Sequence, residues 1–456
     1  MGFSKRFKKS YSIAILVIGF GMGSLAAEAD VIKPGAPHFT KTGQIDSFQW
    51  VPTNYIDANH PSTFSYDIFY YIPQSLASAT NVNALIFNHG GGSSTLDRPG
   101  SLHAVSLYIN DLVTLADRLG CVVVLPSANG LNWGGHTVGL MTALSKLMRT
   151  EMNIDPQHLG LSGHSMGGMG ITRSYWLLAD QFAFFLPQAD GMDLSYAPDS
   201  VTEWQLNKVF NVAYTQLQGT HDEFDIFITR NQDQLARTEA LEVKYGLPSK
   251  LQMIFYNTDH DYKLSMFQDF LDQSFQTTRD LYQTELFGTF STGSSWATEH
   301  NITFPYTPNP RYFWVEAIPD SIDTVETTNF HAKIQNNQIT MEFPVLPTLS
   351  HQIKIYLHSK MVDLTKPVNV MIDGVLVGTR DPAINTATLQ SVDPTDPTFI
   401  YEDTMTVTLP TVASPAVYPT PTPEPSATPV PTPVSTPTPM PTSTPAPTPT
   451  PSGIGN

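Results

Sequence analysis

The chain has 456 residues, of which 41% are hydrophobic and 11% aromatic, and its net charge at neutral pH is −17. This composition excludes a wholly disordered chain, and the length suits two domains plus some unfolded sequence. An acidic excess of this size repels nucleic acid and anionic membranes, so we expect neither as a partner. The single cysteine, Cys121, excludes an internal disulfide and is expected in a buried strand, because it opens a run of apolar residues.

The first 29 residues have the order of a secretory signal peptide. Basic residues between Lys5 and Lys9 precede an apolar run from Tyr11 to Phe20, and small residues then end at Ala29. The apolar run is short for a membrane span. We therefore expect cleavage after residue 29, no transmembrane span in the mature chain, and a location that is secreted, periplasmic or on the cell surface.

Residues 30–290 are predicted to form an α/β domain with a mostly parallel sheet. Short apolar runs alternate with longer segments of helical spacing, which is typical of this class. The expected strands are Tyr66–Ile72, Asn83–Phe87, Cys121–Leu125, His158–Leu161, Phe182–Leu186, Ala213–Leu217 and Leu251–Tyr256, and the expected helices are Ser101–Leu119, Val138–Met152 and Met169–Leu178.

The pattern changes to all-β after this region, and residues 296–410 are predicted to form a small sandwich-like domain. His351–Leu357 alternates polar and apolar residues with period two. Asp373-Gly374 and Asn336-Asn337 each separate two strand-like segments, as hairpin turns do. Residues 411–456 are rich in Pro and Thr, with sixteen of the 37 prolines from Pro410 to Pro451, and are predicted to be a disordered linker or stalk.

The strongest chemical signal is Gly163-His-Ser-Met-Gly-Gly168, which follows an expected strand and precedes an expected helix. A serine at a sharp strand-to-helix turn needs glycines around it, because side chains there would collide with neighbouring backbone. Such a turn exposes the hydroxyl at the carboxyl edge of the sheet, close to the positive end of the helix dipole. Ser165 is therefore the predicted nucleophile of a serine hydrolase.

A second glycine-rich segment, Asn88-His-Gly-Gly-Gly92, directly follows another expected strand. Glycines allow backbone N–H groups to turn toward an oxygen atom, so this loop is suited to hold a developing oxyanion. We expect the donors to be the N–H of Met166 and that of Gly90 or Gly91.

An activated serine needs a base, and the base needs an acid that orients it. In this motif the acid follows the serine, and Asp222 lies just past the strand Ala213–Leu217. Asp225 is its nearest rival, and Asp190 and Asp193 are weaker alternatives.

The expected base is His260, which follows the strand Leu251–Tyr256 and is the only histidine between His221 and His300. His89 and His164 lie inside the two glycine motifs and are expected to pack around the site. The sequence has no H-E-x-x-H or clustered Cys/His pattern, so we expect neither a metal nor a cofactor.

Two tryptophans are candidate substrate-binding residues. In open α/β sheets the substrate lies beyond the carboxyl ends of the strands. Trp133 follows the Cys121 strand and Trp204 lies between the two later strands, so both are expected near the pocket, with a place in the core as the alternative.

These motifs resemble those of the α/β-hydrolase superfamily, and most closely its secreted esterase branch, which includes feruloyl esterases and polyhydroxybutyrate depolymerases. The resemblance covers about residues 65–285 and depends on the H-G-G-G loop, the G-H-S-M-G-G turn, the G-T-H-D segment from Gly219 and the D-H-D segment around His260. It implies hydrolysis of a carboxylic ester, with Ser165, His260 and Asp222 as the catalytic triad. The sequence departs from many secreted members in lacking disulfides.

The favoured interpretation is an exported hydrolase that cleaves a small or polymer-linked carboxylic ester. One alternative is a serine peptidase or amidase on the same fold. Another is a non-enzymatic surface-binding protein, in which the β-domain or the tail contacts an extracellular polymer or the cell surface.

Overall fold

In the computed structural model, the described residues are 30–52, 65–91, 97–129, 133, 136–190, 203–262, 264–292, 295–299, 302–306, 310–320, 326–347, 351–382, 390–393 and 395–410. The predicted signal peptide and the Pro/Thr-rich tail lie outside them. The contacts within the chain group Met1–Thr411 as one compact unit and Val412–Asn456 as another.

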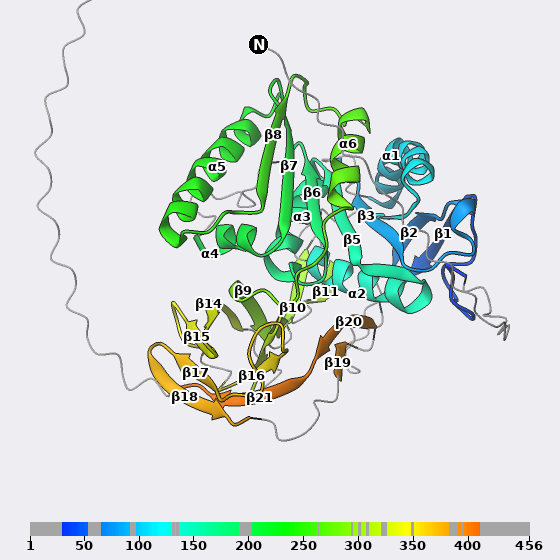
Figure 1. Cartoon of the computed structure of the whole chain (residues 1–456). Coiled ribbons are helices and arrows are strands. Elements are labelled where there is room, and N and C mark those ends of the chain that lie inside the picture. Colours follow the sequence, from blue (N-terminus) through cyan, green and yellow to red (C-terminus); the bar gives the residue numbers. More distant parts are fainter. Residues whose placement is uncertain are drawn as a thin grey trace, which may run out of the picture. The chain divides into compact units, whose positions relative to one another are not determined.

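The centre of the first unit is an eight-stranded sheet (Figure 1) with the order β1-β2-β4-β3-β5-β6-β7-β8. β2 runs antiparallel to its two neighbours, and all strands from β4 to β8 across the sheet are parallel. The strands are β1 Ile45–Trp50, β2 Tyr66–Tyr71, β3 Val82–Asn88, β4 Cys121–Pro126, β5 Ile154–His164, β6 Phe184–Gln188, β7 Ala213–Gly219 and β8 Leu251–Tyr256.

The helices cover both faces of this sheet because its strands are apolar on both sides. Alternate strand residues face two separate apolar clusters: Ile86 belongs to one, and Leu85 and Phe87 to the other. The helices are α1 Arg98–Leu119, α2 His136–Glu151, α3 Met166–Leu178, α4 Glu203–Leu206, α5 Asp225–Tyr245 and α6 Leu264–Ser274, with short 3₁₀ turns η2 Gln74–Leu76 and η4 Asn207–Phe210. Side chains of α2 and α3 join the first cluster and those of α1 and α6 the second.

The C-terminal part consists of β-strands. A five-stranded sheet has the order β18-β17-β15-β14-β9, a four-stranded sheet has the order β12-β13-β16-β21, and two strand pairs complete it. The strands are β9 Glu285–Thr292, β10 Ser295–Glu299, β11 Ile302–Tyr306, β12 Arg311–Tyr312, β13 Val315–Ile318, β14 Glu326–Gln335, β15 Gln338–Glu342, β16 Gln352–Leu357, β17 Val368–Ile372, β18 Val375–Arg380, β19 Gln390–Asp393, β20 Asp396–Tyr401 and β21 Asp403–Thr408.

Both predicted hairpins are present. Asn336 and Asn337 have φ values of 52° and 61° and join β14 to β15, while Asp373 and Gly374 have φ values of 47° and 81° and join β17 to β18. Positive φ at both central residues is what a two-residue hairpin turn requires. The predicted fold class, a mostly parallel sheet flanked by helices followed by an all-β part, is confirmed.

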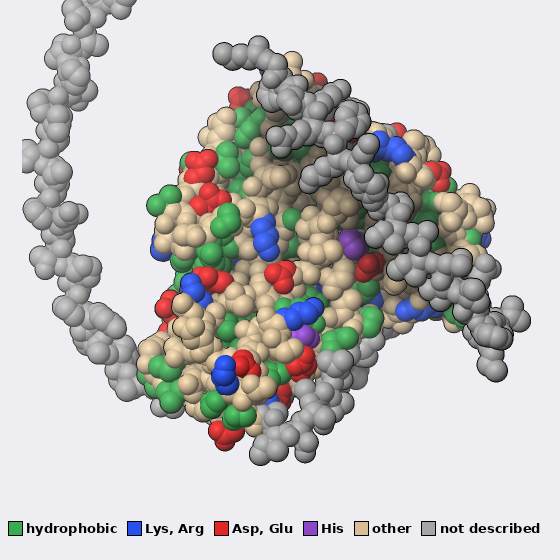
Figure 2. Space-filling view, in the orientation of Figure 1, with side chains coloured by type: hydrophobic (Ala, Val, Ile, Leu, Met, Phe, Trp, Pro, Cys, Tyr) green, Lys and Arg blue, Asp and Glu red, His purple; other side chains and the backbone are tan. Residues whose placement is uncertain are grey.

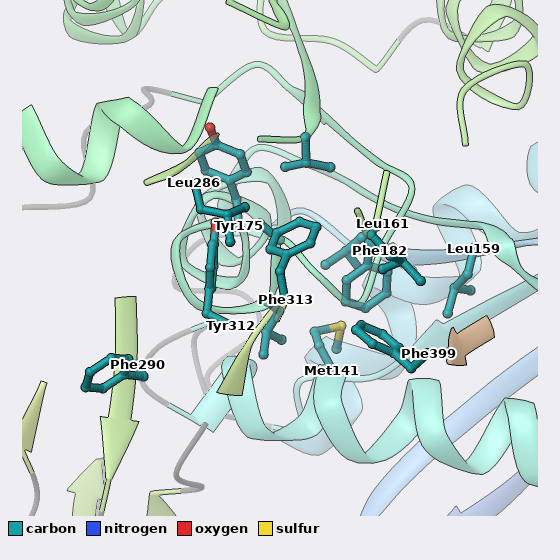
Figure 3. Packing of buried hydrophobic residues seen from close by; sticks show 14 of the residues in the cluster. Met141, Leu159, Leu161, Tyr175, Phe182, Leu286, Phe290, Tyr312, Phe313 and Phe399 are labelled. Carbon is teal, nitrogen blue, oxygen red and sulfur yellow. The ribbon is translucent and has the colours of Figure 1, made fainter. Parts of the chain in front are cut away.

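The α/β and β parts share one apolar core. Figure 3 shows Met141 of α2 and Leu159 of β5 close to Phe399 of β20, and Tyr175 of α3 beside Tyr312. β9 begins at Glu285, before the end of the predicted catalytic domain, so strands of the second part start earlier than residue 296. The two-domain division at residues 290–296 stays a prediction, since the contacts group both parts in one unit.

Buried charges also join the two parts. Asp396 at the start of β20 accepts a hydrogen bond of 2.8 Å from Nη2 of Arg279, and Nη1 of Arg149 lies 3.6 Å from the same carboxylate. All three side chains are almost fully buried. The two arginines lower the pKa of Asp396 against the opposing effect of burial, which by itself would raise it.

The surface of the described residues carries mixed charge. On the face shown in Figure 2, the side chains of Asp and Glu are interspersed with those of Lys and Arg, and hydrophobic side chains are scattered among them. Among the described residues, no helix is long and apolar enough to cross a membrane.

Replacing Asp396 with Ala is expected to destabilise the protein by about 3–5 kcal/mol, because it leaves two buried arginines without their shared carboxylate. The measurement is the midpoint of urea unfolding. Asp233→Ala removes an exposed helical ion pair with Arg237 and is the matched control, with a midpoint close to that of the wild type. Equal midpoints for the two variants would contradict the prediction.

Candidate active site

Ser165 lies at a sharp turn between β5 and α3. Its φ and ψ are 53° and −119°, a conformation that non-glycine residues rarely adopt. Its backbone N–H donates to the carbonyl of Gln188 over 2.8 Å, which holds the turn against β6. The side chain is only partly buried, so the turn presents the hydroxyl at the carboxyl edge of the sheet.

Ser165, His260 and Asp222 are connected by hydrogen bonds. The Ser165 Oγ lies 2.7 Å from Nε2 of His260, and Nδ1 of the same ring lies 2.8 Å from Oδ2 of Asp222. Because a carboxylate only accepts, Nδ1 carries the hydrogen and Nε2 is free to accept the hydroxyl proton. This is the arrangement that activates a serine for attack on a carbonyl.

The Asp222 carboxylate is fully buried and held by two further donors. Its Oδ2 also accepts from Nε2 of Gln218 over 2.8 Å, and its Oδ1 accepts from the Phe224 N–H over 2.8 Å. The Gln218 amide is itself fixed by Nδ2 of Asn231, which donates to Gln218 Oε1 over 3.0 Å. These bonds set the direction in which the carboxylate faces His260.

The rival acids are not joined to His260. Asp225 is exposed at the start of α5, and Asp193 lies outside the described residues. Asp190 is fully buried and accepts from Gln216 Nε2 over 2.7 Å and from the Thr172 hydroxyl over 3.2 Å. Desolvation by burial raises the pKa of Asp190 to about 7, although both hydrogen bonds act in the opposite direction.

The loop after β3 is held in place by hydrogen bonds of buried groups. The Nε2 of His89 accepts from the Ala128 N–H over 3.0 Å, and its Nδ1 donates to the carbonyl of Gly90 over 2.8 Å. The indole N–H of Trp133 donates to the carbonyl of His89 over 2.8 Å. Burial lowers the pKa of His89 to about 4, so its ring is neutral at physiological pH.

The two described glycines of this loop differ in their surroundings. The Gly90 backbone lies against the Tyr108 side chain, since a Cβ atom added to Gly90 would lie 2.6 Å from the Tyr108 hydroxyl, whereas Gly91 has a φ of 127° and is only partly buried. Met166 is the first residue of α3, where backbone N–H groups point toward the helix start rather than to helix carbonyls. Gly92 lies outside the described residues.

His164 lies beside His260, with ring centroids 5.3 Å apart. Its Nε2 lies 2.8 Å from the carbonyl oxygen of His260, and its Nδ1 lies 2.9 Å from the Tyr108 hydroxyl. Since both nitrogens are occupied, His164 is not placed to accept the proton of Ser165. Desolvation, reinforced by His260, lowers the pKa of His164 to about 4.

The two tryptophans predicted to bind substrate lie in different parts of the α/β fold. Trp133 is only 1% exposed, and its side chain packs against Gly170 of α3 and the ring of His89. It supports the loop from the core, which is the alternative that the sequence left open.

Trp204 lies on α4, far from Ser165. The neighbouring Glu203 carboxylate accepts from Lys244 Nζ over 2.6 Å, at the C-terminal end of α5. α5 begins three residues after Asp222, and its 21 residues span about 30 Å. Trp204 therefore lies near the end of α5 that is remote from Asp222, and the expectation that it binds substrate stays a prediction.

Aromatic residues border His260. The ring of Phe224 lies 4.8 Å from that of His260, edge to face, and that of Phe227 lies 5.9 Å away. Phe224 and the neighbouring Ile226 are 47% and 51% exposed. No sequence motif marks these residues, and only their position just after Asp222 could have suggested them.

No group of three or more His, Cys, Asp or Glu side chains with the geometry of a metal site is present in the described part of the chain.

The buried Asp190 generates a prediction about pH. Its folded pKa is raised, so between about pH 4 and pH 7 the folded state holds a proton that the unfolded state has released, and stability falls as pH rises. The wild-type free energy of unfolding, minus that of Asp190→Asn, should fall by up to about 1.4 kcal/mol per pH unit over this range. Urea unfolding at several pH values measures it. Asp225→Asn, at an exposed position, is the control, and parallel profiles for wild type and Asp190→Asn would contradict the prediction.

No protein-family model and no curated protein matches the chain. Among solved structures it is similar to a thermostable esterase, with 15% identity, a TM-score of 0.38, and coverage of 52% of this chain and 63% of that one, less than two thirds of its length. It is also similar to a poly(3-hydroxybutyrate) depolymerase from Bordetella parapertussis (16% identity, TM-score 0.41, 56% of this chain and 96% of that one). A feruloyl esterase module from Clostridium thermocellum is a further similar structure (14% identity, TM-score 0.37, coverage of 54% of this chain and 92% of that one).

The order of the eight strands and the turn at Ser165 give this chain the α/β-hydrolase fold.

Proposed function

We propose that the protein is an exported serine hydrolase that cleaves carboxylic esters through an acyl-enzyme intermediate. The observation that carries the proposal is the continuous hydrogen-bonded series from Ser165 Oγ through His260 to the buried Asp222. A serine at a strained strand-to-helix turn, bonded to an imidazole whose other nitrogen is held by a carboxylate, is suited to acyl transfer.

In the proposed reaction, Ser165 Oγ attacks the ester carbonyl carbon while Nε2 of His260 takes the hydroxyl proton. Asp222 holds the ring and stabilises the imidazolium that forms. When the tetrahedral intermediate collapses, His260 gives the proton to the departing alkoxide and the acyl group remains on Ser165. Water then attacks the acyl-enzyme, with His260 as base, and releases the acid and the free serine.

The tetrahedral oxyanion needs backbone donors, and the proposed pair is the N–H groups of Met166 and Gly91. The start of α3 favours negative charge near Met166. Gly90 is packed tightly against Tyr108 and His164, whereas Gly91 is only partly buried, which favours Gly91 as the second donor. Losing one such donor typically costs about 3–4 kcal/mol in the barrier.

Two further elements of the proposal depend on the sequence. Export depends on the predicted signal peptide of residues 1–29, and a cell-surface position depends on the Pro/Thr-rich residues 411–456; both segments lie outside the described residues. Contact with an extracellular polymer through the β part or the tail stays a prediction. Because the β part shares an apolar core with the α/β part, we expect it to stabilise the fold, whether or not it also binds a polymer.

The activated serine is testable with a fluorophosphonate probe, which reacts only with a nucleophilic serine. The purified mature wild type is expected to be labelled, whereas Ser165→Ala and His260→Ala are expected to lose labelling, because one lacks the nucleophile and the other its base. A folded wild type that remains unlabelled would contradict the proposal and favour the surface-binding alternative.

Parallel assays on nitrophenyl esters and peptide anilides separate an esterase from a peptidase or amidase. The expected result is turnover of the esters and little or none of the anilides. Preferential turnover of the anilides would overturn the ester assignment and leave the triad intact.

The exposed Phe224 predicts a preference for apolar esters. Because its ring borders His260, Phe224→Ala is expected to raise KM several-fold for nitrophenyl octanoate, leave kcat nearly unchanged, and hardly affect nitrophenyl acetate. Val243→Ala, an 85% exposed position near the other end of α5, is the matched control. Equal KM changes for both chain lengths would show that Phe224 does not contact the acyl group.

A further inference from the structure

Two buried residues beside the triad, Tyr108 and His164, have no role in the mechanism described so far. Tyr108 lies on α1 and His164 is the last residue of β5, and each is 7% exposed. The Tyr108 hydroxyl lies 2.9 Å from Nδ1 of His164, and the His164 Nε2 lies 2.8 Å from the carbonyl oxygen of His260. The backbone of Gly90 lies against the same hydroxyl.

The direction of every hydrogen in this series is fixed by chemistry. A carbonyl oxygen only accepts, so the His164 Nε2 must carry the hydrogen. A neutral imidazole has only one N–H, so Nδ1 accepts and the Tyr108 hydroxyl donates to it. The series therefore runs in one direction, from the Tyr108 hydroxyl through His164 to the backbone of His260.

The surroundings leave these groups little freedom. A Cβ atom added to Gly90 would lie 2.6 Å from the Tyr108 hydroxyl and 2.8 Å from the His164 Nδ1, so the loop passes directly over them. The ring of Tyr262 packs edge to face against both, at 5.2 Å from Tyr108 and 6.0 Å from His164. Buried hydrogen bonds in such a site are costly to break, because the freed groups have no water to replace the lost partner.

We propose that Tyr108 and His164 are positioning residues, which together tie the loop that carries the oxyanion donor to the backbone of the general base. The proposal rests on the proposed hydrolase function. Tyr108 and His164 lie directly against the Gly90 backbone, next to the proposed donor Gly91, and His164 holds the carbonyl of His260. Loop and base lie 170 residues apart in sequence, yet they must keep a fixed separation during the reaction, since small displacements of reacting groups are costly in rate.

Three variants separate the polar groups from the shapes of the rings. Tyr108→Phe keeps the ring and removes only the hydroxyl. His164→Asn places an oxygen near the position of Nδ1, so it can still accept from Tyr108, but it is too short to reach the His260 carbonyl. His164→Gln places an amide nitrogen near the position of Nε2 and keeps that donor.

The matched control is Tyr71→Phe. Tyr71 is 6% exposed, and its hydroxyl donates to Asp117 of α1 over 2.7 Å, so this variant also removes a buried hydroxyl that contacts α1. Unlike Tyr108, it contacts neither the loop nor the triad histidine in the described bonds.

The experiment measures kcat and KM on a nitrophenyl ester, the rate of fluorophosphonate labelling, and the thermal unfolding midpoint of each full-length mature variant. Tyr108→Phe is expected to lose at least tenfold in kcat, with KM within twofold of wild type and a midpoint close to that of Tyr71→Phe. His164→Asn is expected to lose more kcat and more labelling rate than His164→Gln, because the bond to His260 is the one nearer the chemistry.

Wild-type kcat in Tyr108→Phe, or an equal loss in His164→Asn and His164→Gln, would overturn the proposal and leave the hydrolase function standing. A loss of activity that follows the unfolded fraction in every variant would also overturn it, since the residues would then be structural only. An unreactive wild type would overturn both proposals together.

Discussion

The close approach of α3 to the end of β3 is the constraint on which the rest of the site depends. A Cβ atom at Gly167 would lie only 2.1 Å from the carbonyl oxygen of Asn88, so no other residue fits there. This contact brings the start of the helix against the residue that leads into the His89 loop. It also forces Ser165 into its positive φ, because the chain must reverse within one residue between β5 and α3. Ser165, the start of α3 and the His89 loop are thus placed by a single backbone contact.

The sequence could predict those parts of the site that depend on backbone geometry. Glycines around Ser165 and in the loop after β3 are needed by the turn itself, so they leave a readable pattern. The order of strands along the chain then favoured an acid after β7, with Asp190 and Asp193 after β6 as weaker alternatives, and a base after β8. The structure brings Asp222 and His260 to Ser165.

Residues that act through side-chain packing left no such pattern. Gln218 of β7 contacts Asp222, and Tyr108 of α1 contacts His164. The sequences of this strand and this helix are typical of a buried core, so nothing in them distinguishes these two residues from other buried ones. The sequence also left open whether Trp133 lines the pocket or lies in the core, because its depth depends on the packing of α3; the side chain is 1% exposed.

The ion cluster between the α/β and β parts has a consequence for how the chain reaches its native state. Arg279 and its carboxylate partner Asp396 are separated by 117 residues in sequence. At ordinary rates of synthesis, that interval takes on the order of ten seconds. During it, the large sheet is complete in sequence, yet Arg149 and Arg279 lack the carboxylate of Asp396 and part of the apolar core has no cover. We therefore expect the α/β part to reach its final packing only after β20 has been made.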